Sequence, residues 1–275
     1  VQLVDVCKDG KTYRFGFDRL KRWIDLCDAR GVRYFEFSHL FTQWGAKHAP
    51  KIVAVENGTE RRIFGWDTDA TGDDYKQFLA QFLPELIRFI REHRLEGRCF
   101  FHVSDEPHLE HLPWYESASS WLKRYLEGFP TIDALSDYAF YERGLVQNPI
   151  PASNHIEPFL ENGVPNLWTY YCCSQYKEVS NRFFCFPSAR NRIIGIQLYK
   201  FDIAGFLQWG YNFWYSQYSR KPIDPYRNTD ANFAFPSGDA YVVYPGPDGK
   251  PVESIRLEVF YEALQDLRAL RLLES

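Results

Sequence analysis

The stretch Arg98-Cys-Phe-Phe-His-Val-Ser-Asp-Glu-Pro107 decides how the rest of the chain is interpreted. Its first half is apolar apart from one histidine, a composition typical of a strand that is buried on both faces of a parallel sheet. Pro107 lacks an amide donor and biases the residue before it toward an extended conformation, so we expect the strand to end there. The sequence therefore predicts two adjacent carboxylates, Asp105 and Glu106, at the C-terminal tip of a buried strand.

Strands and helices alternate outward from this stretch in both directions. The hydrophobic pattern predicts strands at 1–6, 32–37, 99–103, 132–135, 145–150, 166–173, 205–214 and 240–244, a hairpin at 51–66, and helices at 17–30, 73–94, 114–126, 155–161, 188–201 and 255–273. Such alternation indicates a parallel α/β fold. No glycine-rich nucleotide-binding motif follows any strand, so the pattern favours a closed (β/α)8 TIM-like barrel, in which active sites lie at the C-terminal ends of the strands.

Length and composition agree with one soluble domain. The 275 residues match the usual size of such a barrel, and the formal net charge is −4. Lysine and arginine are scattered, so neither nucleic acid nor an anionic membrane is an expected partner, and no apolar run is long enough to span a bilayer. The six cysteines have no C-x-x-C spacing, which argues against a zinc ribbon and against thioredoxin chemistry.

The adjacent carboxylates are unusual for a glycosidase pair. Ordinary retaining and inverting enzymes hold their two acids roughly 5 to 9.5 Å apart across the scissile bond. Adjacent acids suit a mechanism in which a 2-acetamido sugar attacks its own anomeric carbon and forms an oxazoline. Asp105 would then orient the acetamido group and stabilise charge on its nitrogen, and Glu106 would be general acid and then base. The alternative interpretation is a solvated Asp-Glu-Pro turn without chemistry.

Neighbouring residues could form two other kinds of site at the same place. His102, His108 and His111 surround the acids and could complete a divalent metal site, although their spacing matches no zinc signature. Ser38 and Ser104 lack the Gly-x-Ser-x-Gly setting of a hydrolase nucleophile, so we expect them to be structural. The sequence predicts neither a metal nor a cofactor.

Several segments spread over nearly the whole chain resemble glycoside hydrolase family 123, the β-N-acetylgalactosaminidases. They are Ser104-Asp-Glu-Pro107, Ser38-His-Leu-Phe-Thr-Gln-Trp-Gly45, the aromatic stretch 205–214, Tyr244-Pro-Gly-Pro-Asp-Gly249 and Ser254-Ile-Arg-Leu-Glu258. The resemblance implies a catalytic barrel over residues 1–275, taken from a longer chain and lacking the β-rich domain that usually precedes it. It also implies retaining, substrate-assisted removal of terminal β-linked N-acetylgalactosamine (GalNAc) from a glycan or glycolipid, with Asp105 as oxazoline stabiliser and Glu106 as acid/base.

The sugar pocket is expected to use aromatic and polar side chains near the ends of strands. Aromatic residues make up 18% of the chain, and their flat faces suit sugar rings, although a large aromatic core would also account for them. The candidates are His39, Trp44, Tyr170, Tyr171, Trp209 and Asn212. Two alternatives to the GalNAc-specific enzyme stay open from the sequence. They are a hexosaminidase of the same mechanism that prefers N-acetylglucosamine (GlcNAc) and a carbohydrate-binding barrel without catalysis.

Overall fold

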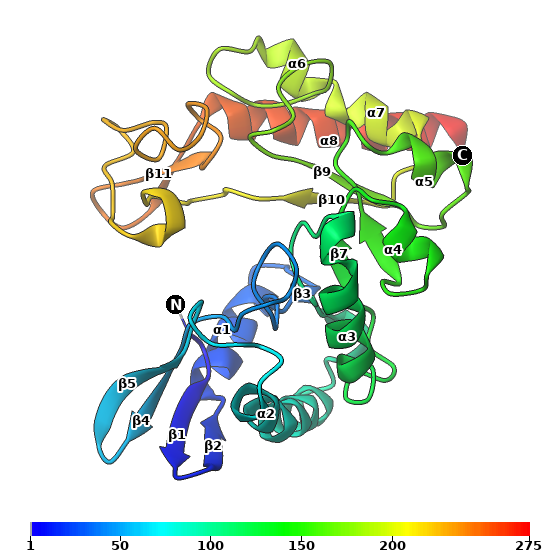
Figure 1. The fold of residues 1–275 in the computed structure, drawn as a ribbon. Helices are drawn as coiled ribbons and strands as arrows, with labels where there is room; N and C mark the ends of the chain where they lie inside the picture. Colours follow the sequence, from blue (N-terminus) through cyan, green and yellow to red (C-terminus); the bar gives the residue numbers. More distant parts are fainter. Residues whose placement is uncertain (1) are drawn as a thin grey trace. The chain divides into compact units, whose positions relative to one another are not determined.

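The computed structural model describes residues 2–275, and the chain divides into two compact units, Val1–Pro149 and Ile150–Ser275 (Figure 1). The first unit contains β1 (Asp5–Asp9), β2 (Thr12–Gly16), α1 (Asp18–Asp28), β3 (Phe35–Glu36), β4 (Ile52–Glu56), β5 (Thr59–Phe64), α2 (Asp73–Glu92), η1 (Glu96–Arg98), β6 (Cys99–Phe100), η2 (Leu109–His111), α3 (Leu112–Leu122), β7 (Ile132–Ala134) and α4 (Ala139–Glu142), followed by β8 (Asn148–Ile150). The expectation of one barrel domain over residues 1–275 stays a prediction.

A mixed sheet with the strand order β2-β1-β4-β5 opens the first unit, with a parallel pair β1–β4 between two antiparallel pairs. Its β4–β5 hairpin turns at Asn57 and Gly58, with φ values of 52° and 75°. Two consecutive residues with positive φ are what a type I′ turn requires, and its backbone twist matches that of the flanking strands. The hairpin predicted at 51–66 is therefore confirmed.

Helix α2 supplies much of the core of the first unit. Its buried face carries large apolar side chains at helical spacing, namely Tyr75, Phe78, Leu79, Leu83, Leu86 and Ile90. Pro84 lies inside the helix and does not divide it. A proline within a helix costs about 3 kcal/mol, whereas each fully buried large apolar side chain contributes roughly 1.5 to 3 kcal/mol. The packed face therefore outweighs the cost of the proline.

Parallel strand pairs lead to the two acids. β3 pairs with β6 in the register Phe35↔Cys99, and a parallel bridge joins Phe101 to Thr131 just before β7, which pairs with β8. The stretch 101–104 is buried throughout, as the sequence predicts. The regular ladder ends at Phe100, earlier than expected, and beyond it the amide of Val103 bonds the side chain of Asp133.

The second unit contains α5 (Glu157–Glu161), β9 (Trp168–Tyr171), α6 (Ser188–Arg192), α7 (Ile194–Lys200), β10 (Gly205–Gln208), η3 (Gln217–Ser219), β11 (Val243–Pro245), β12 (Pro251–Glu253) and α8 (Ile255–Glu274). β9 and β10 pair in parallel, β11 and β12 pair in antiparallel, and α8 runs beside α6 and α7 (Figure 1). The final helix is confirmed. The strand predicted at 205–214 is shorter, and Gly210, with a φ of 72°, follows its end.

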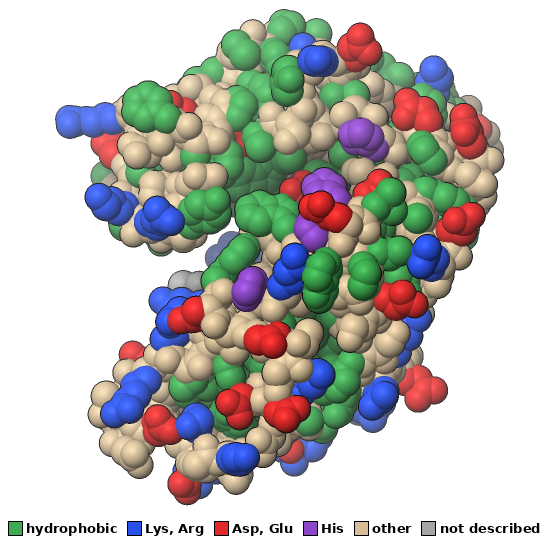
Figure 2. All heavy atoms as spheres, in the orientation of Figure 1, with side chains coloured by type: hydrophobic (Ala, Val, Ile, Leu, Met, Phe, Trp, Pro, Cys, Tyr) green, Lys and Arg blue, Asp and Glu red, His purple; other side chains and the backbone are tan. Residues whose placement is uncertain are grey.

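The fold class is confirmed as far as α/β alternation. Among residues 2–275 the strands form one four-stranded sheet and four two-stranded sheets rather than a closed barrel, so the (β/α)8 barrel stays a prediction. Within the same residues, none of the helices has the length and apolar character that crossing a membrane requires. On the face drawn in Figure 2, basic and acidic side chains are interspersed.

Gly195 allows α7 and α8 to approach closely in the second unit. A Cβ atom at this position would lie 1.9 Å from the carbonyl oxygen of Ala263 on α8. We therefore expect Gly195→Ala to lower the free energy of unfolding by about 1 to 3 kcal/mol or more, although alanine has the better helix propensity by about 1 kcal/mol. Urea denaturation measures the change. In the control variant Gly97→Ala, the new methyl group meets open space, and a stability loss as large as that of Gly195→Ala would contradict the packing argument.

Candidate active site

Asp105 and Glu106 lie beyond the end of β6, where the sequence predicts them, and both side chains are partly exposed. Glu106 has a φ of 45°, in the left-handed region that non-glycine residues seldom adopt. Two main-chain hydrogen bonds hold this backbone. The amide of Glu106 donates to the Ala134 carbonyl at 2.8 Å, and the main-chain carbonyl of Asp105 accepts from the Trp44 amide at 2.9 Å. The left-handed residue interrupts the alternation that would send neighbouring side chains of an extended strand to opposite faces.

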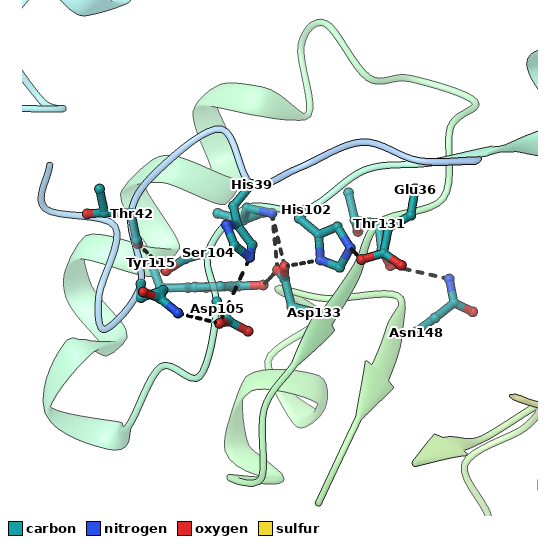
Figure 3. A network of polar contacts seen from close by, with 12 residues as sticks. Glu36, His39, Thr42, His102, Ser104, Asp105, Tyr115, Thr131, Asp133 and Asn148 are labelled. Atoms are coloured by element: carbon teal, nitrogen blue, oxygen red, sulfur yellow. Dashed lines mark hydrogen bonds and ion pairs between the residues drawn. The ribbon is translucent and has the colours of Figure 1, made fainter. Parts of the chain in front are cut away.

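The carboxylate of Asp105 is contacted from the loop that follows β3. Gln43 donates its side-chain amide to Oδ2 at 2.9 Å, and His39 Nε2 lies 4.0 Å from the same oxygen (Figure 3). The sequence predicts His39 at the site but does not distinguish Gln43, although Gln43 lies in the loop 38–45 that supports the family resemblance. The structure thus brings together His39, Gln43 and Asp105.

Trp44 lies on the same loop with a φ of 57°, and 40% of its surface is exposed. Its ring packs edge-on against Trp66 at 6.0 Å between centroids. The next residue, Gly45, has a φ of 112°, and a Cβ there would lie 2.8 Å from the His111 ring. The tight turn therefore places an exposed indole on the residue whose amide bonds Asp105, while contact between Trp44 and a sugar stays a prediction.

The other four sugar-site candidates belong to the second unit. Tyr170 and Tyr171 are buried in its core, and the Tyr171 hydroxyl donates to Asn191 Oδ1 at 3.4 Å. Burial raises the pKa of Tyr171 to about 12. Trp209 is half-buried and packs against Phe235 at 5.1 Å between centroids, and Asn212 is exposed. Trp209 and Asn212 therefore have solvent-accessible surface that a ligand could contact. Sugar contact by any of the four residues stays a prediction.

The sequence does not predict a polar network that lies close to the acid segment. Asp133 on β7 is fully buried and accepts from the Val103 amide at 3.1 Å and from the Tyr115 hydroxyl. Its Oδ1 also lies 3.1 Å from His102 Nδ1, and His102 Nε2 lies 2.7 Å from Glu36 Oε1 (Figure 3). Buried charged groups require partners of this kind.

The histidines of the metal hypothesis have other partners. His102 lies between two carboxylates, and His111 accepts from the His108 amide at 3.0 Å through Nδ1. Across residues 2–275, no three His, Cys, Asp or Glu side chains are grouped as a metal would need them. Ser104 is fully buried and donates to the Thr42 carbonyl at 2.7 Å, which confirms its structural role.

The first unit also has a cavity of about 680 Å³ with a mainly apolar lining from α1, α2, β3 and β4. It reaches Glu36 and His39 but neither Asp105 nor Glu106. A sugar ring needs polar partners for its hydroxyl groups, which an apolar lining does not supply.

The chain resembles known glycoside hydrolases. A family 123 glycoside hydrolase from Clostridium perfringens, described in work on glycolipid glycan hydrolysis, superimposes with a TM-score of 0.74 at 18% identity, over 99% of this chain and 48% of that one. The chain thus spans about half the length of that protein. Two structures of a family 5 mannosidase from Rhizomucor miehei reach TM-scores of only 0.36 and 0.35, at 11% and 10% identity, over 97% and 98% of this chain and 98% and 99% of those.

The search of curated proteins found no match. The model of the glycoside hydrolase 123 catalytic domain, by contrast, matches residues 1–273. Because this match covers almost every residue, the chain belongs to glycoside hydrolase family 123.

Proposed function

We propose that this chain is a retaining glycosidase that removes terminal β-linked GalNAc from a glycan or glycolipid with help from the substrate's own acetamido group. The observation that carries the proposal is the adjacency of Asp105 and Glu106 beyond the end of β6, with the backbone of Glu106 in a left-handed conformation. Adjacent acids leave the role of nucleophile to the substrate. Family membership supports glycoside hydrolysis, and the Clostridium perfringens relative supports a glycolipid substrate.

In the first step the acetamido oxygen attacks the anomeric carbon, and the bond from that carbon to the leaving oxygen breaks. Glu106 donates its proton to the leaving oxygen. Asp105, held by Gln43 and close to His39, stabilises the positive charge that develops on the acetamido nitrogen. In the second step the Glu106 carboxylate takes a proton from water, which attacks the anomeric carbon and opens the oxazoline. Two displacements at one carbon give net retention.

We expect the chain to hydrolyse aryl β-GalNAc glycosides and to release the β-anomer first, which proton NMR detects. A thiazoline mimic of the oxazoline should inhibit strongly, because transition-state and intermediate analogues bind about 10² to 10⁸-fold more tightly than substrates.

Aryl β-GlcNAc glycosides are the matched comparison for this assay. Faster hydrolysis of the GlcNAc series would replace GalNAc specificity with the hexosaminidase alternative. Release of the α-anomer, or the lack of thiazoline inhibition, would contradict the substrate-assisted mechanism. Sugar binding without hydrolysis of either series would indicate a carbohydrate-binding protein.

A further inference from the structure

His102 lies between two carboxylates that contact its two ring nitrogens. Nδ1 is 3.1 Å from Asp133 Oδ1, and Nε2 is 2.7 Å from Glu36 Oε1. An ionised carboxylate only accepts hydrogen bonds, so both ring nitrogens donate when Glu36 and Asp133 are ionised, and a histidine that donates from both nitrogens is an imidazolium. Burial by itself would lower the pKa of His102, but the bonds to Asp133 and Glu36 raise it to about 10. The positive charge therefore persists through neutral pH and is lost only as the pH rises through that value.

Asp133 needs this charge. Its side chain is 0% exposed and accepts from the Val103 amide, the Tyr115 hydroxyl and His102. Removing one partner of a buried ion pair is strongly destabilising, because it leaves a charge uncompensated. Burial raises the pKa of Asp133, and the His102 imidazolium opposes this shift and favours the ionised carboxylate that anchors the amide of Val103.

Strand β7 then holds the acid segment at two points. The side chain of Asp133 bonds the amide of Val103, two residues before Asp105, and the carbonyl of Ala134 bonds the amide of Glu106. A left-handed conformation is unfavourable for a non-glycine residue and persists only where the surroundings fix it. The two anchors on adjacent residues of β7 provide that constraint.

We propose that His102 is a positioning residue of the active site, whose charge compensates Asp133 and thereby fixes the backbone that presents Asp105 and Glu106. The inference rests on the proposed function of these two acids. His102 is faced by Glu36 from β3, by Asp133 from β7 and, edge-on at 5.6 Å between ring centroids, by His39 (Figure 3). Tyr115 from α3 reaches it through Asp133.

The charge of His102 can be measured without an activity assay. In the chain labelled with ¹⁵N-histidine, both ring nitrogens of His102 should stay protonated from about pH 6 to pH 9. The His102→Gln spectrum assigns the signals. A His102 ring that titrates to the neutral form below pH 8 would overturn the proposal, and this result would not depend on which substrate the chain cleaves.

The positioning role is tested by kinetics on whichever aryl glycoside the chain hydrolyses. His102→Gln should lower kcat by about 10²-fold, the effect of a misplacement of about 1 Å, with KM within about threefold because binding is retained. Adding Asp133→Asn to His102→Gln removes the uncompensated charge and keeps an oxygen that accepts from the Val103 amide. The kcat of the double variant should therefore be about tenfold higher than that of His102→Gln, because residues in contact are energetically coupled. His155→Gln is the control. If the double variant instead shows the summed kcat losses of the two single variants, the positioning role of His102 is contradicted.

Glu36→Gln keeps the inference testable if His102→Gln does not fold, because the Glu36 side chain is 45% exposed and its amide replacement still offers an acceptor. Loss of this carboxylate lowers the pKa of His102. The ratio of the variant's kcat to the wild-type kcat should therefore be near one at pH 6 and fall by about tenfold by pH 9. Taking the ratio removes any pH dependence of kcat that both proteins share. A ratio that is constant over this range would overturn the proposal.

Discussion

Replacing Glu106 with glutamine is expected to lower kcat/KM for a GalNAc glycoside with a poor leaving group by about 10² to 10⁴-fold, the usual contribution of a positioned general acid. Glutamine has nearly the same size and cannot give up a proton to the leaving oxygen. The backbone contact is unaffected, because Glu106 bonds Ala134 through its main-chain amide. We therefore expect the loss to be chemical rather than structural.

A series of aryl glycosides with leaving groups of different pKa measures this effect. A dinitrophenolate leaves without protonation, so its glycoside should lose far less activity in Glu106→Gln than a glycoside with a poor leaving group. Glu116→Gln changes an exposed glutamate on α3 and serves as the control. An equal loss for all leaving groups would refute the role of Glu106 as the acid.

The local parts of the fold could be predicted from the sequence. The 51–66 hairpin follows from Asn57-Gly58, and the final helix follows from its apolar spacing, because both depend on neighbouring residues. The acid pair is also a local feature, since proline follows a buried stretch. Closure of a barrel depends on pairing between distant strands, which periodicity does not specify.

The network around His102 could not be predicted in the same way. Glu36 lies on β3, His102 follows the end of β6, and Asp133 lies on β7, so these residues meet only because distant segments of the chain lie side by side. In the sequence, His102 interrupts an apolar run and Asp133 lies inside a short one, which could have suggested a buried charge pair but not its partners. The contact of Gln43 with Asp105 could not be predicted for another reason. In the sequence, Gln43 does not differ from the other polar residues of its loop, and only the structure shows its bond to Asp105.

Burial also separates candidates that look alike in sequence. Tyr170 and Tyr171 lie in an aromatic strand. Such a composition is found both in strands that end at a pocket and in strands within the core. The structure buries both rings, whereas it leaves 40% of Trp44 exposed. Aromatic content therefore predicts an aromatic-rich fold more securely than it predicts which rings face a sugar.

Asp105→Asn is expected to lower kcat/KM by about 10² to 10³-fold, the range found when one group that stabilises transition-state charge is removed. Asparagine can still accept the bond from Gln43, but it carries no negative charge to oppose the charge on the acetamido nitrogen. Because this group acts on the acetamido side of the sugar, the loss should be the same for good and poor leaving groups. Thiazoline affinity should fall as well.

The same aryl glycoside series measures the Asp105 variant, with Asp25→Asn as the control because Asp25 lies in an exposed pair with Lys21, where a surface ion pair contributes only about 0 to 1 kcal/mol. A loss confined to poor leaving groups would make Asp105 the acid and reverse the two roles. Unchanged thiazoline affinity would remove Asp105 from the oxazoline step. We expect the loss of kcat/KM to be independent of the leaving group in Asp105→Asn and to depend on it in Glu106→Gln. This pair of results would place the two adjacent carboxylates on opposite sides of the anomeric carbon.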